Sequence, residues 1–340
     1  MSFPGQSNNS MSLKDAVLKI RRTLQTRLSN LLGLSATERA LSAPVVADPD
    51  RHGIALVAIV KDEARYIGEW IAFHANLGVR SIYIYDNGST DETVALAQGR
   101  KFLADVRVIP WMNFGRHIRI QTAAYNHAVA NFGRRYRWMM FLDIDEFVFP
   151  KQGRDLNETM AAFDGVPAVS FPWQMFGPSG HKRRPDTLVV EAYRERAAFP
   201  FTPETASLLN YKTIADPTVI KWAHTHYCEL WDDDGAMFND AGQRFWRFDR
   251  FNLQYATAER IQLNHYFTRS YEEFEQKIAK RRVSKEGRTD HRQGLEYQLG
   301  CINRNTVRDD GAVRFAGDVK AALAIADRRT RSGFQPSASP

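Results

Sequence analysis

Two aspartates separated by one residue, Asp143 and Asp145, follow an apolar segment and precede Glu146 in the motif FLDIDEF. Carboxylates this close repel one another unless a cation or a basic group offsets their charge. Hard divalent cations such as Mg²⁺ and Mn²⁺ are held by one or two carboxylates and share their other positions with water and phosphate oxygens. The motif therefore predicts a divalent metal site that receives a diphosphate. A solvated or salt-bridged acidic turn is the alternative.

Two further groups of polar residues follow apolar segments of strand length. Lys61, Asp62 and Glu63 follow Ile54–Val60. A turn-rich run after Ser81–Tyr85 holds Asp86, Asn87, Ser89, Thr90 and Asp91. Ligands of an open α/β sheet bind beyond the carboxyl ends of its strands, so we expect all three groups to face one crevice. Taken singly, Asp86 and Asn87 also suit a turn, and Asp91 suits a helix N-cap.

The segments that position these groups alternate between strand and helix. A helix with Ile67, Trp70, Ile71, His74 and Leu77 on its inner face follows the first strand. The alternation continues with a helix after Thr90, a strand at 106–109, a helix at 118–132 and a strand at 138–142. This order predicts an α/β fold with a mainly parallel sheet.

Beyond Pro150 the pattern becomes irregular and indicates a mixed second half. Strand-like runs occur at Ala168–Met175, Leu188–Tyr193 and Val219–Ala223. The segment Tyr271–Lys285 has acidic residues early and basic residues late, as a helix dipole favours.

The two ends of the chain carry no predicted chemistry. Residues 1–10 and 331–340 are polar or rich in Ser and Pro, which is typical of disorder. Leu13–Leu34 has apolar residues at helical spacing with basic residues between them, and a polar linker at 35–52 follows. We expect this basic amphipathic helix to dock on the domain or on a second copy of the chain, with attachment to an anionic membrane face as the alternative.

The composition limits the classes of partner. Among 340 residues, Lys and Arg outnumber Asp and Glu by 46 to 39, a net charge of +7, which favours an anionic partner such as a nucleotide, an anionic glycan or a membrane surface. No nucleic-acid-binding motif accompanies these residues, so a nucleic-acid partner is not expected. Two cysteines without a CxxC spacing disfavour disulfides and structural zinc. The first residues lack the pattern of a secretory signal, and we expect a cytosolic protein.

Several motifs together resemble glycosyltransferase family 92 and the related family-2-like bacterial transferases, over about residues 54–285. They are VAIVKDEARYIGEWIAFHANLGVRSIYIYDNGSTDET, FLDIDEF, WQMFGPSGH, KTIADPTVIKWAHTH and NHYFTRSYEEFEQK. The resemblance implies a GT-A fold, a nucleotide-diphosphate sugar donor, a metal bound by the DxD motif, and inversion at the anomeric carbon. It also implies a donor-binding half at 53–150 and a half at 151–330 that binds the acceptor and completes the metal site.

Carried onto this sequence, the resemblance makes Asp143 and Asp145 the DxD pair, with Asp145 as the direct metal ligand. It makes His224 the third ligand, with His226 as the alternative and a structural loop histidine as the plain interpretation. Lys212 would neutralise the diphosphate, unless it is a surface lysine. No role is predicted for the histidine of the NHY motif.

The segment WQMFGPSGHKRRP combines aromatic, small and basic residues, which suits the binding of an acceptor sugar. Its predicted acceptor-binding residues are Trp173, Phe176, Ser179 and His181. Core packing is the alternative for Trp173.

An inverting transfer also needs a base that deprotonates the acceptor hydroxyl. Glu191 is the first candidate, and Asp186 and the run Asp232–Asp234 are the alternatives. Pairing with a nearby arginine is the structural interpretation of Glu191.

Two rival functions remain. A nucleotidyltransferase also uses paired acids and a metal on an α/β sheet, but it normally carries a glycine-rich loop after its first strand, where this chain has KDEARYIGEW with a single glycine. The non-enzymatic rival is a carbohydrate-binding protein on a degenerate GT-A fold, and the acidic pair argues against it.

Overall fold

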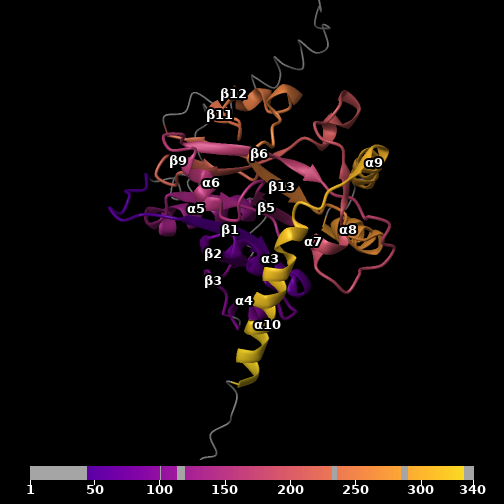
Figure 1. The fold of residues 1–340 in the computed structure, drawn as a ribbon, viewed down its shortest axis with the longest axis horizontal. Helices are drawn as coiled ribbons and strands as arrows, with labels where there is room; N and C mark the ends of the chain where they lie inside the picture. Colours follow the sequence, from indigo (N-terminus) through magenta and orange to yellow (C-terminus); the bar gives the residue numbers. More distant parts are fainter. Residues whose placement is uncertain (1–43, 100, 113–118, 232–235, 285–289, 333–340) are drawn as a thin grey trace, which may run out of the picture. The chain divides into compact units, whose positions relative to one another are not determined.

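The computed structural model describes residues 44–99, 101–112, 119–231, 236–284 and 290–332. The predicted N-terminal helix at 13–34, the first half of the linker (35–43), the Asp232–Asp234 run and the last eight residues lie outside the described parts of the chain. Figure 1 shows the arrangement of the described elements.

The first half alternates strands and helices as the sequence predicts. Its elements are β1 (Ile54–Val60), α3 (Ala64–Asn76), β2 (Val79–Asp86), α4 (Thr93–Gln98), β3 (Asp105–Pro110), α5 (Ile120–Phe132), η1 (Gly133–Arg135), β4 (Trp138–Phe141) and β5 (Glu146–Pro150). β1 is the run IALVAIV, almost wholly buried, as expected of a strand covered on both faces. β1 pairs in parallel with β2 and β4, and β2 pairs in parallel with β3.

The second half continues the same sheet with mixed strand directions. Its elements are α6 (Leu156–Ala161), β6 (Ala168–Met175), α7 (Val189–Ala192), β7 (Glu195–Ala197), η2 (Pro203–Leu208), β8 (Tyr211–Ala215), β9 (Ile220–Ala223), β10 (Cys228–Leu230), β11 (Ala236–Phe238), β12 (Arg244–Trp246), η3 (Arg247–Asp249), η4 (Leu253–Tyr255), β13 (Ile261–His265), α8 (Tyr271–Ser284), α9 (Asp290–Arg304), β14 (Thr306–Arg308), η5 (Val313–Phe315) and α10 (Ala316–Ser332). The predicted α/β class with a mixed second half is confirmed.

The main sheet has eight strands in the order β3-β2-β1-β4-β8-β6-β13-β5. β8 runs antiparallel between β4 and β6, and β13 lies between β6 and β5, parallel to the former and antiparallel to the latter. The boundary predicted at residue 150 therefore falls within one continuous sheet.

Helices cover both faces of the parallel strands. On one face, the inner residues of α3 pack with Leu56, Ile82 and residues of α10, and Figure 1 shows α10 running beside α3. On the other face, Tyr125 and Ala128 of α5 pack against Val57 and Tyr85. The side chains of the buried strands thus point alternately into two separate apolar layers, one on each face of the sheet.

The strand predicted at Leu188–Tyr193 is wrong, because this segment contains the short helix α7. The carboxylate of Glu69, on α3, accepts hydrogen bonds from the backbone N–H groups of Val189 and Val190 at 2.8 and 3.2 Å. These are N–H groups of the first helical turn, which lack partners within a helix. A side chain 120 residues away thus favours a helix where the local apolar pattern favours a strand.

Candidate functional site

The candidate site lies where the ends of four strands meet. β4 ends at Phe141, and the Asp143–Asp145 turn leads from it to Glu146 at the start of β5. Because β8 is antiparallel to β4, its first residues, with Lys212, lie beside the end of β4. His265, the last residue of β13, pairs with Glu146.

Lys212 sits in the acidic cluster and is buried. Its Nζ lies 3.1 Å from Oδ2 of Asp143 and 3.3 Å from Oε2 of Glu146, and its side chain is only 1% exposed. Burial by itself would lower the pKa of Lys212, but the charges of Asp143 and Glu146 raise it overall. The surface-lysine interpretation is therefore wrong. The positive charge of Lys212 stabilises the carboxylates of Asp143 and Glu146.

Glu146 connects this cluster to the neighbouring strands. Its Oε1 accepts a hydrogen bond from the indole N–H of Trp173 at 2.7 Å, and its Oε2 accepts one from the backbone N–H of Asp143 at 2.8 Å. Burial raises the pKa of Glu146 to about 8, and the attraction of Lys212 opposes this rise. Glu146 thus fixes the turn between β4 and β5 from inside the fold.

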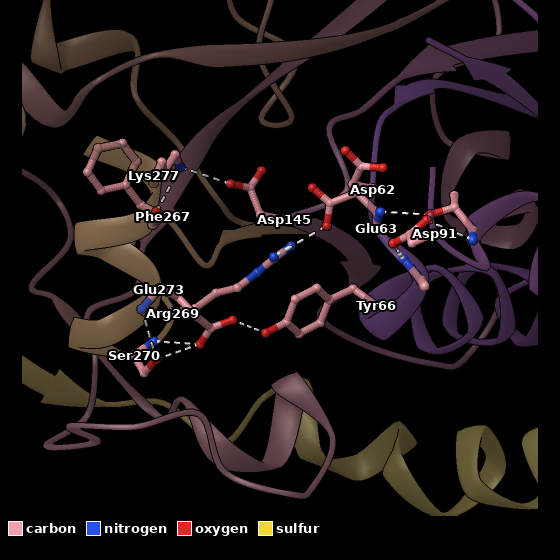
Figure 2. Close-up of polar contacts among 12 residues, drawn as sticks. Asp62, Glu63, Tyr66, Asp91, Asp145, Phe267, Arg269, Ser270, Glu273 and Lys277 are labelled. Atoms are coloured by element: carbon pink, nitrogen blue, oxygen red, sulfur yellow. Dashed lines mark hydrogen bonds and ion pairs between the residues drawn. The ribbon is translucent and has the colours of Figure 1, made fainter. Parts of the chain in front are cut away.

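Asp145 lies in a second cluster, drawn in Figure 2. Its Oδ2 is 3.5 Å from Nε2 of His265 and 3.2 Å from Nζ of Lys277, on α8. Burial would raise the pKa of Asp145, but the charges of Lys277, His265 and Arg269 hold it well below its ordinary value. Asp145 is therefore an ionised carboxylate next to an imidazole.

Asp145 and His265 fit a divalent cation. Two ligand atoms 3.5 Å apart can both reach one cation about 2.1 Å from each. The buried Nδ1 of His265 has no hydrogen-bond partner in the structure. Within the described residues, no group of three or more His, Cys, Asp or Glu side chains is arranged to bind a metal ion. Mg²⁺ and Mn²⁺ need no such group, because they take one or two protein ligands and complete their shells with water and phosphate.

The structure places His224, the predicted third ligand, in a different environment. Its Nε2 is 3.2 Å from Oε1 of Glu229, and its ring stacks on Tyr227. His226, the alternative, contacts the backbone oxygen of Tyr211 and the ring of Trp173, and burial lowers its pKa to about 4. The histidine that contacts Asp145 is His265, for which no role is predicted from the motifs.

The polar groups after β1 and β2 meet across the first two strand ends. The carboxylate of Asp62 accepts hydrogen bonds from the backbone and side chain of Thr90, and that of Asp91 accepts one from the N–H of Ala64. These contacts hold the two turns together and give both aspartates a structural role. Lys61 is exposed, and the side chain of Asn87 is half-buried.

Asp86 is nearly buried at the end of β2, and its carboxylate accepts hydrogen bonds from the backbone N–H of Ser89. The side chain of Glu63 points to Arg269, whose Nη1 lies 3.4 Å from its Oε2 (Figure 2). Arg269 stacks on Tyr66, with its guanidinium carbon 3.6 Å from the ring centroid. The first predicted cluster therefore faces Asp145 through a buried arginine.

Two residues at this crevice adopt a backbone conformation that non-glycine residues rarely adopt. The φ angles of Asp62 and Arg269 are 55° and 52°. Such conformations cost about 1 to 3 kcal/mol and gather at functional sites, where the surrounding structure imposes them.

The predicted acceptor-binding residues have different fates. Trp173 is half-buried and packs on His265 with 4.3 Å between ring centroids. Phe176 is wholly buried in the main core, so its side chain has no surface to offer an acceptor. The hydroxyl of Ser179 accepts hydrogen bonds from two backbone N–H groups, and Nε2 of His181 donates to the backbone oxygen of Ala192, the last residue of α7. Phe176 follows the end of β6 and packs into the core, so the prediction of acceptor binding is wrong for this residue.

The candidate bases are engaged elsewhere. Glu191 accepts hydrogen bonds from Lys320 at 2.6 Å and from Thr187 at 2.8 Å, so both of its oxygens have structural partners. Asp186 is fully exposed and pairs with Arg65 at 3.0 Å. These contacts weaken the prediction for Glu191, which remains untested.

The sequence prediction places Glu146 in the acidic cluster without its buried contacts, and it assigns no role to His265 or Lys277. A signal for the last exists in the motif SYEE. Ser270 and Glu273 form reciprocal hydrogen bonds between side chain and backbone, the capping box that begins a helix. Once the start of α8 is fixed in this way, Lys277 lies two turns along it.

Comparison with known proteins agrees with the motifs. A sequence model of Glycosyltransferase family 92 matches residues 54–296. A family 92 protein of Oryza sativa subsp. japonica is 24% identical over 209 residues, which cover 60% of this chain and 34% of the relative. One of Arabidopsis thaliana is 30% identical over 182 residues, which cover 47% of this chain and 31% of the relative. The chain spans about a third of the length of these curated relatives. They are plant proteins and do not support the bacterial part of the resemblance.

Two solved structures are also similar to this chain. TarS of S. aureus is 15% identical with a TM-score of 0.34, over 73% of this chain and 43% of TarS. The mannosyltransferase PcManGT from Pyrobaculum calidifontis, in complex with GDP-Man and Mn²⁺, is 19% identical with a TM-score of 0.25, over 40% of each chain. The predicted GT-A fold is confirmed. Its parallel half consists of β3, β2, β1 and β4, an acidic turn follows β4, and the mixed half follows that turn.

Proposed function

Because this chain belongs to glycosyltransferase family 92, we propose that it transfers a sugar from a nucleotide-diphosphate donor to a hydroxyl of a glycan or another acceptor. The observation that carries the proposal is the pairing of Asp145 with His265 at the end of the parallel strands, where ligands of α/β folds bind. We propose that these two residues hold a Mn²⁺ or Mg²⁺ ion. When bound, this cation supplies Lewis-acid stabilisation to the departing diphosphate.

Each remaining residue of the crevice has a role that follows from its contacts. Lys212 and Glu146 hold Asp143 in place, and a third of the Asp143 side chain stays exposed to meet the donor. Gln121 donates to Oδ1 of Asp143 at 2.7 Å and limits its rotation. Asp143 is thereby positioned to accept a hydrogen bond from the ribose or from a water on the cation.

The nucleoside is proposed to lie over the ends of β1 and β2. Asp86 and Asn87 end β2, and Asp62 ties the neighbouring turn to it through Thr90. The buried Arg269 offsets the charge of Glu63 beside the path of the diphosphate. Trp173, half-buried next to His265, offers a ring face near the place where the sugar must be held.

The nucleotidyltransferase alternative has less support. Its glycine-rich phosphate loop would follow β1, where this chain has Lys61, Asp62 and Glu63, and Glu63 is committed to Arg269. A binding protein on a degenerate fold would not need an ionised Asp145 beside a histidine.

The test compares two histidines. We expect UDP or GDP to bind more tightly with Mn²⁺ than with EDTA in calorimetric titrations. Asp145→Asn and His265→Ala should each lower the affinity measured with Mn²⁺ to the value measured in EDTA. His224→Ala, which removes the histidine paired with Glu229, is the matched control and should keep the Mn²⁺ effect. An unchanged Mn²⁺ effect in His265→Ala would refute the proposed ligand, and a screen of nucleotide sugars for donor hydrolysis would then identify the donor independently.

The location of the protein stays a prediction. Within the described residues, the helices are too short or too polar to span a bilayer. We propose cytosolic action, with the basic segment predicted as a helix at 13–34 as a contact to an anionic membrane face or to a second copy. Sedimentation with anionic liposomes, with and without residues 1–43, tests the membrane contact.

A further inference from the structure

Lys277 is held at the site in an unusual way. Its Nζ donates to Oδ2 of Asp145 at 3.2 Å and to the backbone oxygen of Phe267 at 2.8 Å, and it lies 4.5 Å from the centroid of the Phe267 ring. The capping box of Ser270 and Glu273 fixes the start of the helix that carries it. Figure 2 shows its ammonium group pointing at Asp145 from the α8 side.

Lys277 and a metal ion would compete for one oxygen. The same Oδ2 of Asp145 faces both Nζ of Lys277 and Nε2 of His265. A divalent cation bound to the same Oδ2, which lies 3.2 Å from the ammonium group, would be at most about 5 Å from that group, and two cations this close repel strongly in a half-buried site. The ammonium group must therefore leave Asp145 when the metal arrives.

Lys277 is free to make this exchange, whereas Lys212 is not. Lys212 is 1% exposed and faces two carboxylates, while the side chain of Lys277 is 28% exposed and faces one. Arg269 cannot take its place, because its guanidinium is stacked on Tyr66 and paired with Glu63. A diphosphate bound at the metal would bring negative charge close to the displaced ammonium group.

We propose that Lys277 is an exchangeable cation, which neutralises Asp145 while the metal is absent and binds the diphosphate of the nucleotide once the metal has taken Asp145. This inference rests on the proposed function and adds an order of events to it. Metal binding releases the lysine, and the released lysine then contributes to nucleotide binding. Lys277 therefore contacts either Asp145 or the diphosphate, and never both at once.

The exchange predicts effects of opposite sign in one variant. In Lys277→Met, the affinity for Mn²⁺ without nucleotide should rise on the order of tenfold, because the competing cation is gone. The affinity for UDP or GDP at saturating Mn²⁺ should fall on the order of tenfold, because a charge-assisted contact to phosphate is lost. Both are measured by calorimetric titration, with the midpoint of thermal unfolding in EDTA as a check on folding.

Two further variants sharpen the test. Lys277→Arg keeps the positive charge, so its Mn²⁺ affinity should not rise. Lys151→Met removes a lysine that binds only a backbone oxygen at 2.9 Å, and both affinities should stay unchanged. Unchanged Mn²⁺ affinity in Lys277→Met, or a change of both affinities in the same direction, would overturn the exchange.

Failure of the proposed function would look different. If the wild-type protein bound neither UDP nor GDP with Mn²⁺, the donor assignment itself would be wrong. If the wild-type protein bound them and Lys277→Met did so equally well, only the role of Lys277 would be refuted.

Discussion

Lys212 is the buried charge on which the acidic turn depends, so replacing it with methionine should destabilise the fold. Its Nζ lies 3.1 Å from Asp143 and 3.3 Å from Glu146. At an effective dielectric constant of about 20, the contact with Asp143 has a gross attraction of about 5 kcal/mol. The cost of burying the lysine and the partial exposure of Asp143 reduce the net value. Removing one member of such a buried pair typically costs about 3 to 5 kcal/mol, and we expect this loss for Lys212→Met.

The assay is equilibrium unfolding in urea at neutral pH with EDTA, followed by tryptophan fluorescence. A double-mutant cycle with Asp143→Asn separates the charge pair from packing. In Asp143→Asn alone, an amide N–H₂ group lies next to the ammonium group of Lys212. In the double variant it lies next to the thioether of the methionine at position 212. The double variant should therefore lose about 1 to 3 kcal/mol less than the sum of the single variants. A loss below about 1 kcal/mol in Lys212→Met, or strict additivity in the cycle, would refute the reasoning.

Three other predictions follow from contacts outside the acidic turn. Burial lowers the pKa of His74 to about 3, so the folded protein does not take up the proton that the unfolded chain binds below about 6.5. The contribution of neutral His74 to the free energy of unfolding is therefore fully present above pH 6.5 and is lost as the pH falls towards 3. In His74→Gln, the decrease of the free energy of unfolding between pH 6.5 and pH 3 should be smaller by up to about 5 kcal/mol. Ser270→Ala removes half of the capping box of α8 and should cost about 1 kcal/mol in urea unfolding, whereas Ser207→Ala, outside that helix, should cost less. Glu191→Gln should leave sugar transfer within about tenfold of wild type because its carboxylate is committed to Lys320 and Thr187, and a loss of a hundredfold or more with intact nucleotide binding would restore Glu191 as the base.

The sequence predicts the parallel half of the fold well, because its signals are local. The apolar run Ile54–Val60 coincides with β1, and the strand predicted at 106–109 lies within β3. Leu188–Tyr193 fails for the opposite reason: its helix depends on Glu69, which lies far away in the sequence. Local propensity decides a segment only where tertiary contacts do not oppose it.

The candidate site also contains residues that the sequence predicts and residues that it does not. Asp143 and Asp145 are found from the motif alone, since two carboxylates at a strand end demand a counter-charge. Which histidine joins them depends on strand order. Because β13 inserts next to β5, His265 reaches Asp145, while His224 follows β9 in a separate two-stranded sheet and pairs with Glu229. Spacing along the chain does not contain this information.

The insertion of β13 between β6 and β5 also has a consequence for the protein during its synthesis. β5 ends at Pro150, and β13 begins about 110 residues later at Ile261, so the ribosome needs on the order of ten seconds to supply it. Until then the hydrogen-bonding edges of β5 and β6 that β13 will cover have no partner, and an uncovered strand edge invites pairing with another chain. The nascent chain can meanwhile complete β3, β2, β1 and β4 as a native sheet, and β8 and β6 can join it once Ala215 has been made, but β5 stays unpaired. A chaperone that shields strand edges would therefore matter most for chains stalled between residues 176 and 260, and such chains would also lack His265.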